Sequence, residues 1–145
     1  MKKRVLSLLM AFALCLGLSV TAGAGDAANG GQTENSVVEV VSNDAETYYD
    51  NLADALNEAP SGETVTLLAD VSCTGVDVRG KTITIKMNGK TITNDGSLGA
   101  DSSTTLKIEG SGSISSAIYV YSSGKLDLSG WTDGTIDFVS LQDEA

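Results

Sequence analysis

Tyr119, Tyr121 and Trp131 are the residues of this chain whose side chains are best suited to contact a ligand. Ile118 and Val120 alternate with the two tyrosines, so a strand that turns both aliphatic residues into a core turns both tyrosines outward. An exposed aromatic face can stack against a sugar ring, whose C–H groups meet the π-face. Trp131 is expected to face outward from the widest corner loop of the repeat. The three aromatics are therefore a candidate glycan-contact set, and the competing interpretation is that they cover a seam between neighbouring coils.

Metal and nucleophilic chemistry have less support. Ca²⁺ takes six to eight oxygen ligands, and Asn94-Asp95-Gly96 offers a few, although such a tripeptide is typical of turns. The chain has no histidine, which argues against a His-ligated metal and a serine-type triad. Cys73 fits a small buried residue better than a catalytic thiol. We expect no catalytic residue, no metal site and no cofactor, with Ca²⁺ at the acidic turns as the alternative that stays open.

The first 24 residues predict a secretory signal peptide. Residues 2–4 are basic, residues 5–20 form an apolar stretch, and Ala22-Gly23-Ala24 supplies a small-x-small cleavage site. The apolar stretch is short for a membrane-spanning helix. We therefore expect a secreted protein, extracellular or on the cell surface, with no membrane segment after cleavage.

Cleavage would leave a strongly acidic chain. All 19 acidic residues follow residue 24 but only six of the nine basic ones do, so the formal net charge becomes 6 − 19 = −13. Such a surface repels nucleic acid and anionic membranes. Only one cysteine would remain, so no intramolecular disulfide can form.

The elements that must position these residues are predicted by an internal repeat. Apolar residues return about every 22 positions in three separate columns, each with the alternation of a β-strand, which is typical of a coil of a parallel β-solenoid. Glycines stand before many of these strands and suit the corners. The columns are Ile83, Leu106 and Leu126; Val76, Leu98 and Ile118; and Ile92, Ile114 and Ile136.

The region ahead of the repeat predicts a leader and a hairpin. Residues 25–36 are small and polar without periodicity, which predicts a disordered leader. Residues 37–41 are rich in valine, residues 42–44 favour a turn, and residues 46–48 read as a second strand. We expect a hairpin whose turn is longer than two residues.

A short capping helix should follow the hairpin. Leu52, Ala55, Leu56 and Ala59 recur at helical spacing on one face, Asp50 is the expected N-cap, and a proline and a glycine end the helix. So short a helix is not stable alone in water. The open end of a solenoid offers it an apolar surface, so we assign residues 37–64 as the N-terminal hairpin and cap.

Residues 65–145 should then form three to four coils. No amphipathic helix or polar cap follows the last strand signal, so we expect the array to be incomplete at its C-terminus, with self-association through the open solenoid end. The expected fold class is all-β: a right-handed parallel β-helix with an N-terminal hairpin and a short capping helix.

Several segments together resemble a known group of proteins. Tyr48, the Leu/Ala helix, residues 62–71 (GETVTLLADV) and residues 88–93 (NGKTIT) are similar to the N-terminal module of secreted or cell-surface proteins of Gram-positive bacteria that carry right-handed β-helix repeats of pectate-lyase-like type. The resemblance covers residues 37–138. It implies adhesin-like or glycan-contacting roles, with extracellular or host glycans or cell-surface proteins as partners.

The same resemblance raises an enzymatic alternative. A pectate-lyase-like fold implies aspartates that hold Ca²⁺ and an arginine that abstracts a sugar proton. Arg79 is the only arginine after the signal, and Asp77 and Asp95 are the nearest carboxylates, which we expect at different corners of the coil. We therefore expect a non-catalytic structural or adhesin-like solenoid, the N-terminal part of a larger array. A polysaccharide lyase or glycoside-active remnant, or a glycan-binding module, is the alternative.

Overall fold

The computed structural model describes residues 28–29 and 31–142, so the expected signal peptide lies outside the described residues. Of Asn94 and Asp95 only the backbone is described. The elements, in chain order, are β1 (Ala28–Asn29), β2 (Val38–Ser42), β3 (Ala45–Tyr49), α1 (Leu52–Glu58), β4 (Thr64–Leu67), β5 (Val71–Cys73), β6 (Val76–Val78), β7 (Thr82–Lys86), β8 (Thr91–Ala100), β9 (Thr105–Tyr121), β10 (Lys125–Asp127) and β11 (Trp131–Gln142).

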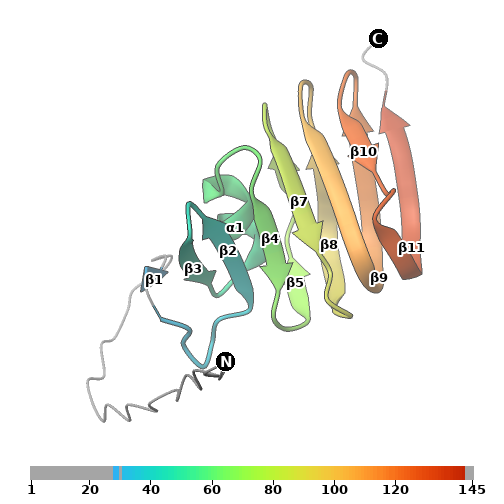
Figure 1. Ribbon diagram of the computed structural model, residues 1–145. Helices are drawn as coiled ribbons and strands as arrows, with labels where there is room; N and C mark the ends of the chain where they lie inside the picture. The colour runs from blue at the N-terminus through green and yellow to red at the C-terminus, as the bar shows by residue number, and fades with distance from the viewer. Residues whose placement is uncertain (1–27, 30, 143–145) are drawn as a thin grey trace, which may run out of the picture.

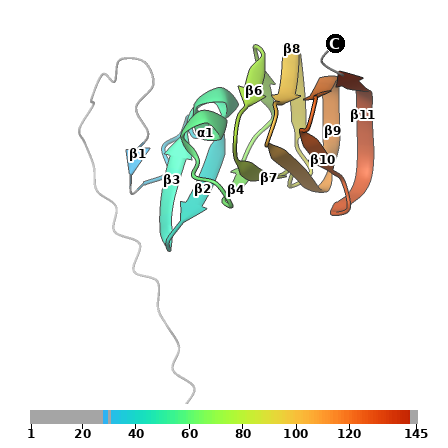
Figure 2. The same cartoon turned by 90° about the horizontal axis from the view of Figure 1, so that it is seen from above.

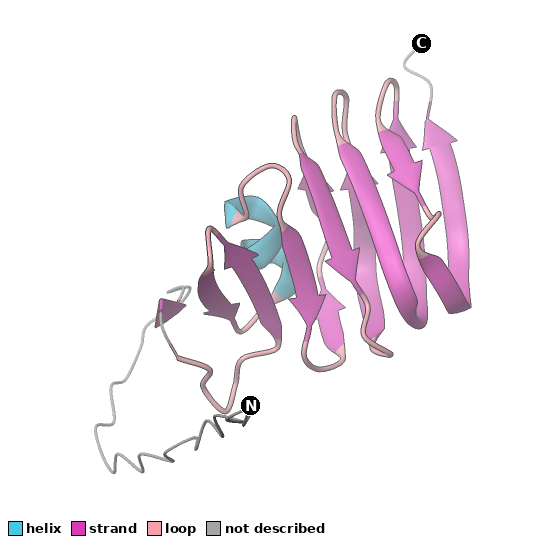
Figure 3. Ribbon diagram, in the orientation of Figure 1, coloured by secondary structure: helices cyan, strands magenta, loops and turns pink. Residues whose placement is uncertain are grey.

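The strands stack into a parallel β-solenoid of about four turns, which confirms the predicted fold class. Figures 1 and 3 show the coils side by side, with the helix and hairpin at the N-terminal end. Seen from above in Figure 2, each coil bends around a shared interior. Within the described residues no helix has the length and apolar character needed to cross a membrane.

All three predicted columns are confirmed by the strand register. Ile83 pairs with Leu106, which pairs with Leu126 on its other side, and these rungs form what we call the first side of the solenoid. The second side holds the rungs of Ile92, Ile114 and Ile136, and the third side holds those of Val76, Leu98 and Ile118. Because β8, β9 and β11 are long and bent, single strands run from one side to the next.

The core follows from the alternation along each strand. Ile83 and Ile85 are fully buried while Thr84 between them is only half-buried, and the same pattern repeats at Leu106 and Ile108. Each strand of a coil therefore supplies aliphatic side chains to one interior column. Burying such a side chain stabilises the fold by roughly 1.5–3 kcal/mol. Met87 and Leu98 are also fully buried, so the interior is continuous from the first side to the third.

The hairpin forms as predicted, but its turn is shorter than expected. Ser42 pairs directly with Ala45, so the turn has two residues, Asn43 and Asp44, both with positive φ (49° and 64°). Two successive positive φ values are what a type I′ hairpin turn requires, and Asn and Asp tolerate them better than other non-glycine residues. The prediction of a longer turn was wrong because it counted Ser42 as turn rather than strand.

The hairpin continues the first side of the solenoid instead of lying across its end. β2 pairs antiparallel with both β3 and β4, and β4 pairs in parallel with β7. The two-residue strand β1, within the segment expected to be a leader, pairs with β3.

The capping helix buries the predicted stripe, since Leu52, Ala55 and Leu56 are fully buried. Its N-cap is Asn51 rather than Asp50: the amide of Asp54 donates to Asn51 Oδ1 at 2.8 Å. A side-chain oxygen satisfies an amide that the helix itself leaves without a partner. The helix packs on β2, β3, β5 and β6 and so covers the first rungs of the second and third sides.

At the C-terminal end, the last rungs are less covered. β10 and β11 each pair with β9, and no other described strand pairs with either. Leu126 and Ile136 pack against the core but are only partly buried. Phe138, Val139 and Leu141 are 54, 41 and 78 % exposed.

Candidate functional site

The third side of the solenoid carries two outward rows of polar and aromatic residues. In the strand register, Asp77 of β6 lies beside Gly99 of β8, and Gly99 lies beside Tyr119 of β9. Residues two positions further along a strand point to the same face. Two positions further along the chain, Tyr121 ends β9, and Arg79 and Asp101 directly follow β6 and β8; these three residues form a second row. The two rows lie on three successive coils, which the repeat places next to one another.

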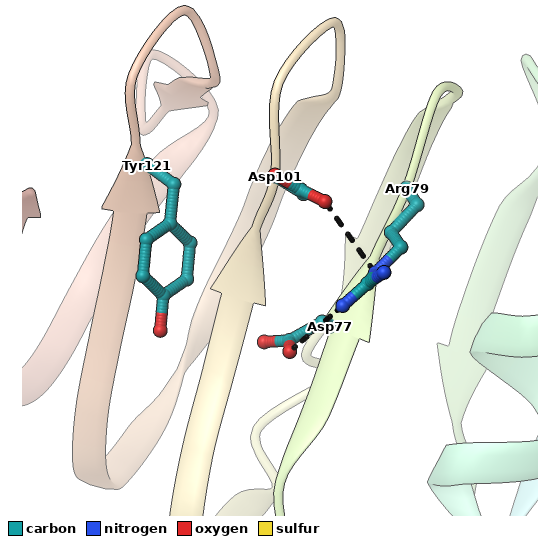
Figure 4. A pocket seen from close by; sticks show the side chains of 4 residues that line it. All are labelled: Asp77, Arg79, Asp101 and Tyr121. Atoms are coloured by element: carbon teal, nitrogen blue, oxygen red, sulfur yellow. Dashed lines mark ion pairs between the residues drawn. The ribbon is translucent and has the colours of Figure 1, made fainter. Parts of the chain in front are cut away.

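Arg79 lies between two carboxylates of this side. Its Nε is 3.4 Å from Asp101 Oδ2 and its Nη2 is 3.7 Å from Asp77 Oδ2. Figure 4 shows the guanidinium reaching between the two acids, with Tyr121 on the neighbouring rung. The Arg79 side chain is 73 % exposed, and both distances exceed the usual length of an N–H···O hydrogen bond. The arginine is thus held near both acids without being enclosed by them.

Asp101 is fixed by its own corner. Its Oδ1 accepts a hydrogen bond from the amide of Ser102 at 2.7 Å, and its backbone carbonyl accepts one from Thr104 at 3.0 Å. Thr104 is fully buried, and its hydroxyl donates to the Val78 carbonyl at 3.0 Å. The corner after β8 is therefore attached to the end of β6, which keeps Asp101 beside Arg79.

Asp77, Arg79, Asp101 and Tyr121 line a pocket of about 350 Å³. Beside it, the buried Gly99 lies beneath the Asp77 and Tyr121 side chains. A Cβ at Gly99 would lie 3.0 Å from Cγ of Asp77 and 3.3 Å from Cε2 of Tyr121, and would collide with Asp77 Oδ1. The absence of a side chain at this position is what lets an acid and an aromatic ring approach each other over β8.

The two tyrosines lie where the sequence predicted. Ile118 and Val120 are buried, Tyr119 and Tyr121 are half-buried on the outside, and their ring centroids are 6.2 Å apart with planes inclined by 22°. At this separation the rings lie side by side along β9. Figure 4 shows the Tyr121 ring running back along its strand, next to the pocket.

Trp131 does not join them. It is the first residue of β11 and not part of a corner loop, it is half-buried against the core, and it pairs with Gly110. Tyr119 pairs with Ser140, nine residues further along β11. We expected Trp131 to face outward from a corner loop, and this was wrong. Ile136 is the first aliphatic residue of β11, but the strand begins before it, at Trp131.

One acid of the lyase alternative lies elsewhere than predicted. Asp77 is in strand β6 and not at a corner, and it approaches Arg79. The side chain of Asp95 is not described. The acid that sequence reasoning missed is Asp101, although the repeat could have found it: the steps of 22 and 20 from Val76 to Leu98 to Ile118 lead from Arg79 to Asp101 to Tyr121.

Other candidate chemistry in the described part of the chain is structural. Cys73 is buried, and burial raises the pKa of its thiol, which keeps it protonated and unreactive. No three acidic or cysteine side chains among the described residues lie close enough together to hold a metal ion.

Comparison with other proteins gives no information on function beyond the fold. No protein-family model matches the chain, and the searches of curated proteins and solved structures found no match. The likeness to Gram-positive surface proteins therefore stays a resemblance, and the arguments about function rest on this chain's own residues.

Proposed function

We propose that this chain is a secreted, non-catalytic β-solenoid of the cell surface, structural or adhesive, that contacts extracellular glycans through the third side. The observation that supports this most is the joining of Tyr121 with Arg79, Asp77 and Asp101 around one pocket. Sugar-binding surfaces combine an aromatic face with polar groups that fix the orientation of hydroxyls.

The polysaccharide-lyase alternative is less well supported by the same residues. A lyase base must take up a proton from the sugar, but a guanidinium stays protonated in proteins. Two carboxylates, Asp77 and Asp101, lie 3.7 and 3.4 Å from the Arg79 guanidinium. We propose that Arg79 donates hydrogen bonds to a ligand and does not act as a base. Incubation with acidic polysaccharides and Ca²⁺ should release no unsaturated sugars, and release that is lost in Arg79→Ala would reverse this assignment.

Binding is tested by titrating the purified protein with a broad glycan panel in a calorimeter. We expect at least one glycan class to bind, and Tyr121→Ala to weaken that binding by about 2- to 10-fold, which corresponds to the roughly 0.5–1.5 kcal/mol of an aromatic contact. Trp131→Phe is the matched aromatic control and should bind as the parent does. If no glycan in the panel binds, or if only the Trp131 variant loses binding, the proposal fails.

Export is tested separately. Expressed in a bacterium with its N-terminus intact, the protein should accumulate outside the cytoplasm and begin at Gly25. Retention of residues 1–24 on the exported protein, or retention of the protein in the cytoplasm, would contradict the secretion part of the proposal.

We also propose that the C-terminal edge associates with another strand. β11 presents Phe138, Val139 and Leu141 to solvent along a strand that pairs with β9 only, within the part of the chain that is described. Unpaired strand edges with apolar side chains favour pairing with a second strand. A second copy of this chain is the partner that a purified sample offers, so association should rise with protein concentration.

A further inference from the structure

We infer that the pocket on the third side selects neutral, hydroxyl-rich sugars over acidic ones. This inference rests on the proposed glycan-contacting function and adds the ligand class and the residues that decide it. Its basis is the pocket lined by Asp77, Arg79, Asp101 and Tyr121, together with Gly99 beneath the Asp77 and Tyr121 side chains.

The charge balance of the pocket argues against an anionic ligand. Two carboxylates, Asp77 and Asp101, lie within 4 Å of the single guanidinium of Arg79. A carboxylate, sulfate or phosphate that approached Arg79 would meet both acids at similar range, in a chain with a formal net charge of −10. One attraction against two repulsions disfavours an anion.

A cation is disfavoured for the complementary reason. The guanidinium already occupies the space between the acids (Figure 4), and it repels an ammonium group or a metal ion. A Ca²⁺ ion would need six to eight oxygens. The two aspartates alone supply too few, and the third charged group of the pocket is positive.

Sugar hydroxyls match the groups that remain. A hydroxyl both donates and accepts hydrogen bonds, a carboxylate only accepts, and a guanidinium only donates. Vicinal hydroxyls can therefore donate to Asp77 and accept from Arg79 without disturbing the charge balance. Because the ion-pair distances of 3.4 and 3.7 Å are long, these groups retain hydrogen-bonding capacity for a ligand.

Tyr121 supplies the apolar wall of the pocket, and Gly99 leaves room for that ring beside Asp77. The tyrosine ring lies next to the position that a Cβ of Gly99 would take, at 3.3 Å. A sugar ring resting against Tyr121 places its C–H face on that ring and its hydroxyls toward the charged groups on β6 and the corner after β8. A side chain at residue 99 would push the Asp77 carboxylate and the Tyr121 ring out of these positions.

The surface beside the pocket also carries uncharged groups that can form hydrogen bonds. Ser140 and Gln142 of β11 lie in register with Tyr119 and Tyr121, and the Gln142 side-chain amide donates to the Ser140 hydroxyl at 2.7 Å. Successive rungs are about 4.8 Å apart. The neutral ligand can therefore extend from β6 across to β11, and oligosaccharides should bind more tightly than single sugars.

The decisive variant is Gly99→Ala, because a Cβ there displaces the Asp77 carboxylate and the Tyr121 ring while every charged and aromatic group of the pocket stays in the sequence. Gly99 does not have a positive φ, so alanine fits its backbone, and the groups that must move are surface side chains. Gly31→Ala is the matched control, since no atom lies within 4 Å of a Cβ at that position. Circular dichroism and thermal unfolding check that both variants keep the fold.

Calorimetric titrations with neutral oligosaccharides (gluco-, manno- and galacto-oligomers) and with oligogalacturonides test the inference. We expect the neutral series to bind, Gly99→Ala to lose about 10-fold or more of that affinity, and Gly31→Ala to lose none. The double variant Asp77→Asn with Asp101→Asn should gain affinity for oligogalacturonides, because the repulsion is removed and Arg79 remains.

Each other outcome has a definite meaning. Tighter binding of oligogalacturonides than of neutral oligomers to the parent protein overturns the inference; the proposed function survives if Tyr121→Ala abolishes that binding. Neutral binding that Gly99→Ala leaves unchanged also overturns the inference, because the site then lies elsewhere. Absence of binding in both series overturns the proposed function and the inference together.

Discussion

The two ends of the solenoid differ in how far their apolar side chains are covered. At the N-terminal end, β2 and β3 extend the first side and α1 covers the first rungs of the other two, so Val38, Leu52 and Leu56 are fully buried. At the C-terminal end, β10 and β11 pair on one side only among the described strands, and Leu141 is 78 % exposed. The comparison shows that a coil buries its apolar side chains fully only when other elements of the protein cover both of its faces.

The first prediction breaks the covered end and should have the largest effect. Leu56→Ala removes a fully buried side chain of α1 and leaves a cavity between the helix and the first coil. We expect a loss of about 2–5 kcal/mol in the free energy of unfolding, measured by urea denaturation. Leu141→Ala, the same change at the open end, should cost less than about 0.5 kcal/mol. Similar costs for the two variants would mean that the ends do not differ as described.

The second prediction uses two valines with the same exposure. Val41 of β2 and Val139 of β11 are both 41 % exposed, but β2 has a partner strand on each side and β11 does not. Sedimentation velocity at rising concentration should show association of the parent protein. Val139→Lys should reduce it strongly because a charge blocks edge pairing, whereas Val41→Lys should leave it unchanged. A parent protein that stays monomeric at all concentrations would refute association through this edge.

The third prediction concerns the attachment of the cap to the first coil. Lys81 Nζ donates to the carbonyls of Asn57 and Ala59, both at 2.8 Å, at the C-terminal end of α1. A cation there satisfies carbonyls that the helix leaves without partners. Lys81→Met keeps much of the aliphatic stem and should destabilise the protein by about 1 kcal/mol or less. The exposed Lys125 on β10 provides the control, since Lys125→Met should change the unfolding midpoint by much less.

The fourth prediction is the smallest and reports on the hairpin of the cap. The Tyr48 hydroxyl donates to Glu46 at 2.8 Å and lies 3.2 Å from Glu39. The bond to Glu46, partial burial and the bond to Glu39 raise the pKa of Tyr48 from 10.0 to about 12. Since the folded-state value is the higher one, this stabilisation is present in full below pH 10 and is lost as the pH rises through 12.

Ultraviolet titration of tyrosinate absorbance tests that value. The parent protein should show a component near pH 12 that is absent in Tyr48→Phe. Tyr49, whose pKa is also raised, mainly by burial, remains in both proteins and serves as the internal comparison. A Tyr48 component near pH 10 would show that the two glutamates do not engage the hydroxyl in solution.

The coils could be predicted from the sequence because one physical rule fixes them. A strand that buries Ile83 and Ile85 must repeat its apolar positions at each coil, so the spacing to Leu106 and Leu126 reveals the register directly. The capping helix followed from the same kind of periodicity in Leu52, Ala55 and Leu56, while its N-cap, set by a single hydrogen bond at Asn51, was misplaced by one residue.

The pocket was harder to predict because it depends on what meets across coils at the surface. No core pattern marks Asp101, and its role arises only when the 22-residue step brings it beside Arg79. Gly99 resembles the many corner glycines of the chain, yet it lies inside strand β8 with a neighbour on each rung. Surface positions follow the repeat in register but not in residue type, so periodicity alone does not assign them a function.

The most direct test of the glycan-contacting surface is a ¹H–¹⁵N correlation spectrum recorded while a neutral oligosaccharide is added to the protein. We expect the amide signals that shift to belong to Asp77, Gly99, Asp101 and Tyr121, together with their neighbours on the third side. Shifts confined to β10 and β11, or to Trp131, would place the contact elsewhere. A spectrum that does not change at any glycan concentration would contradict the account.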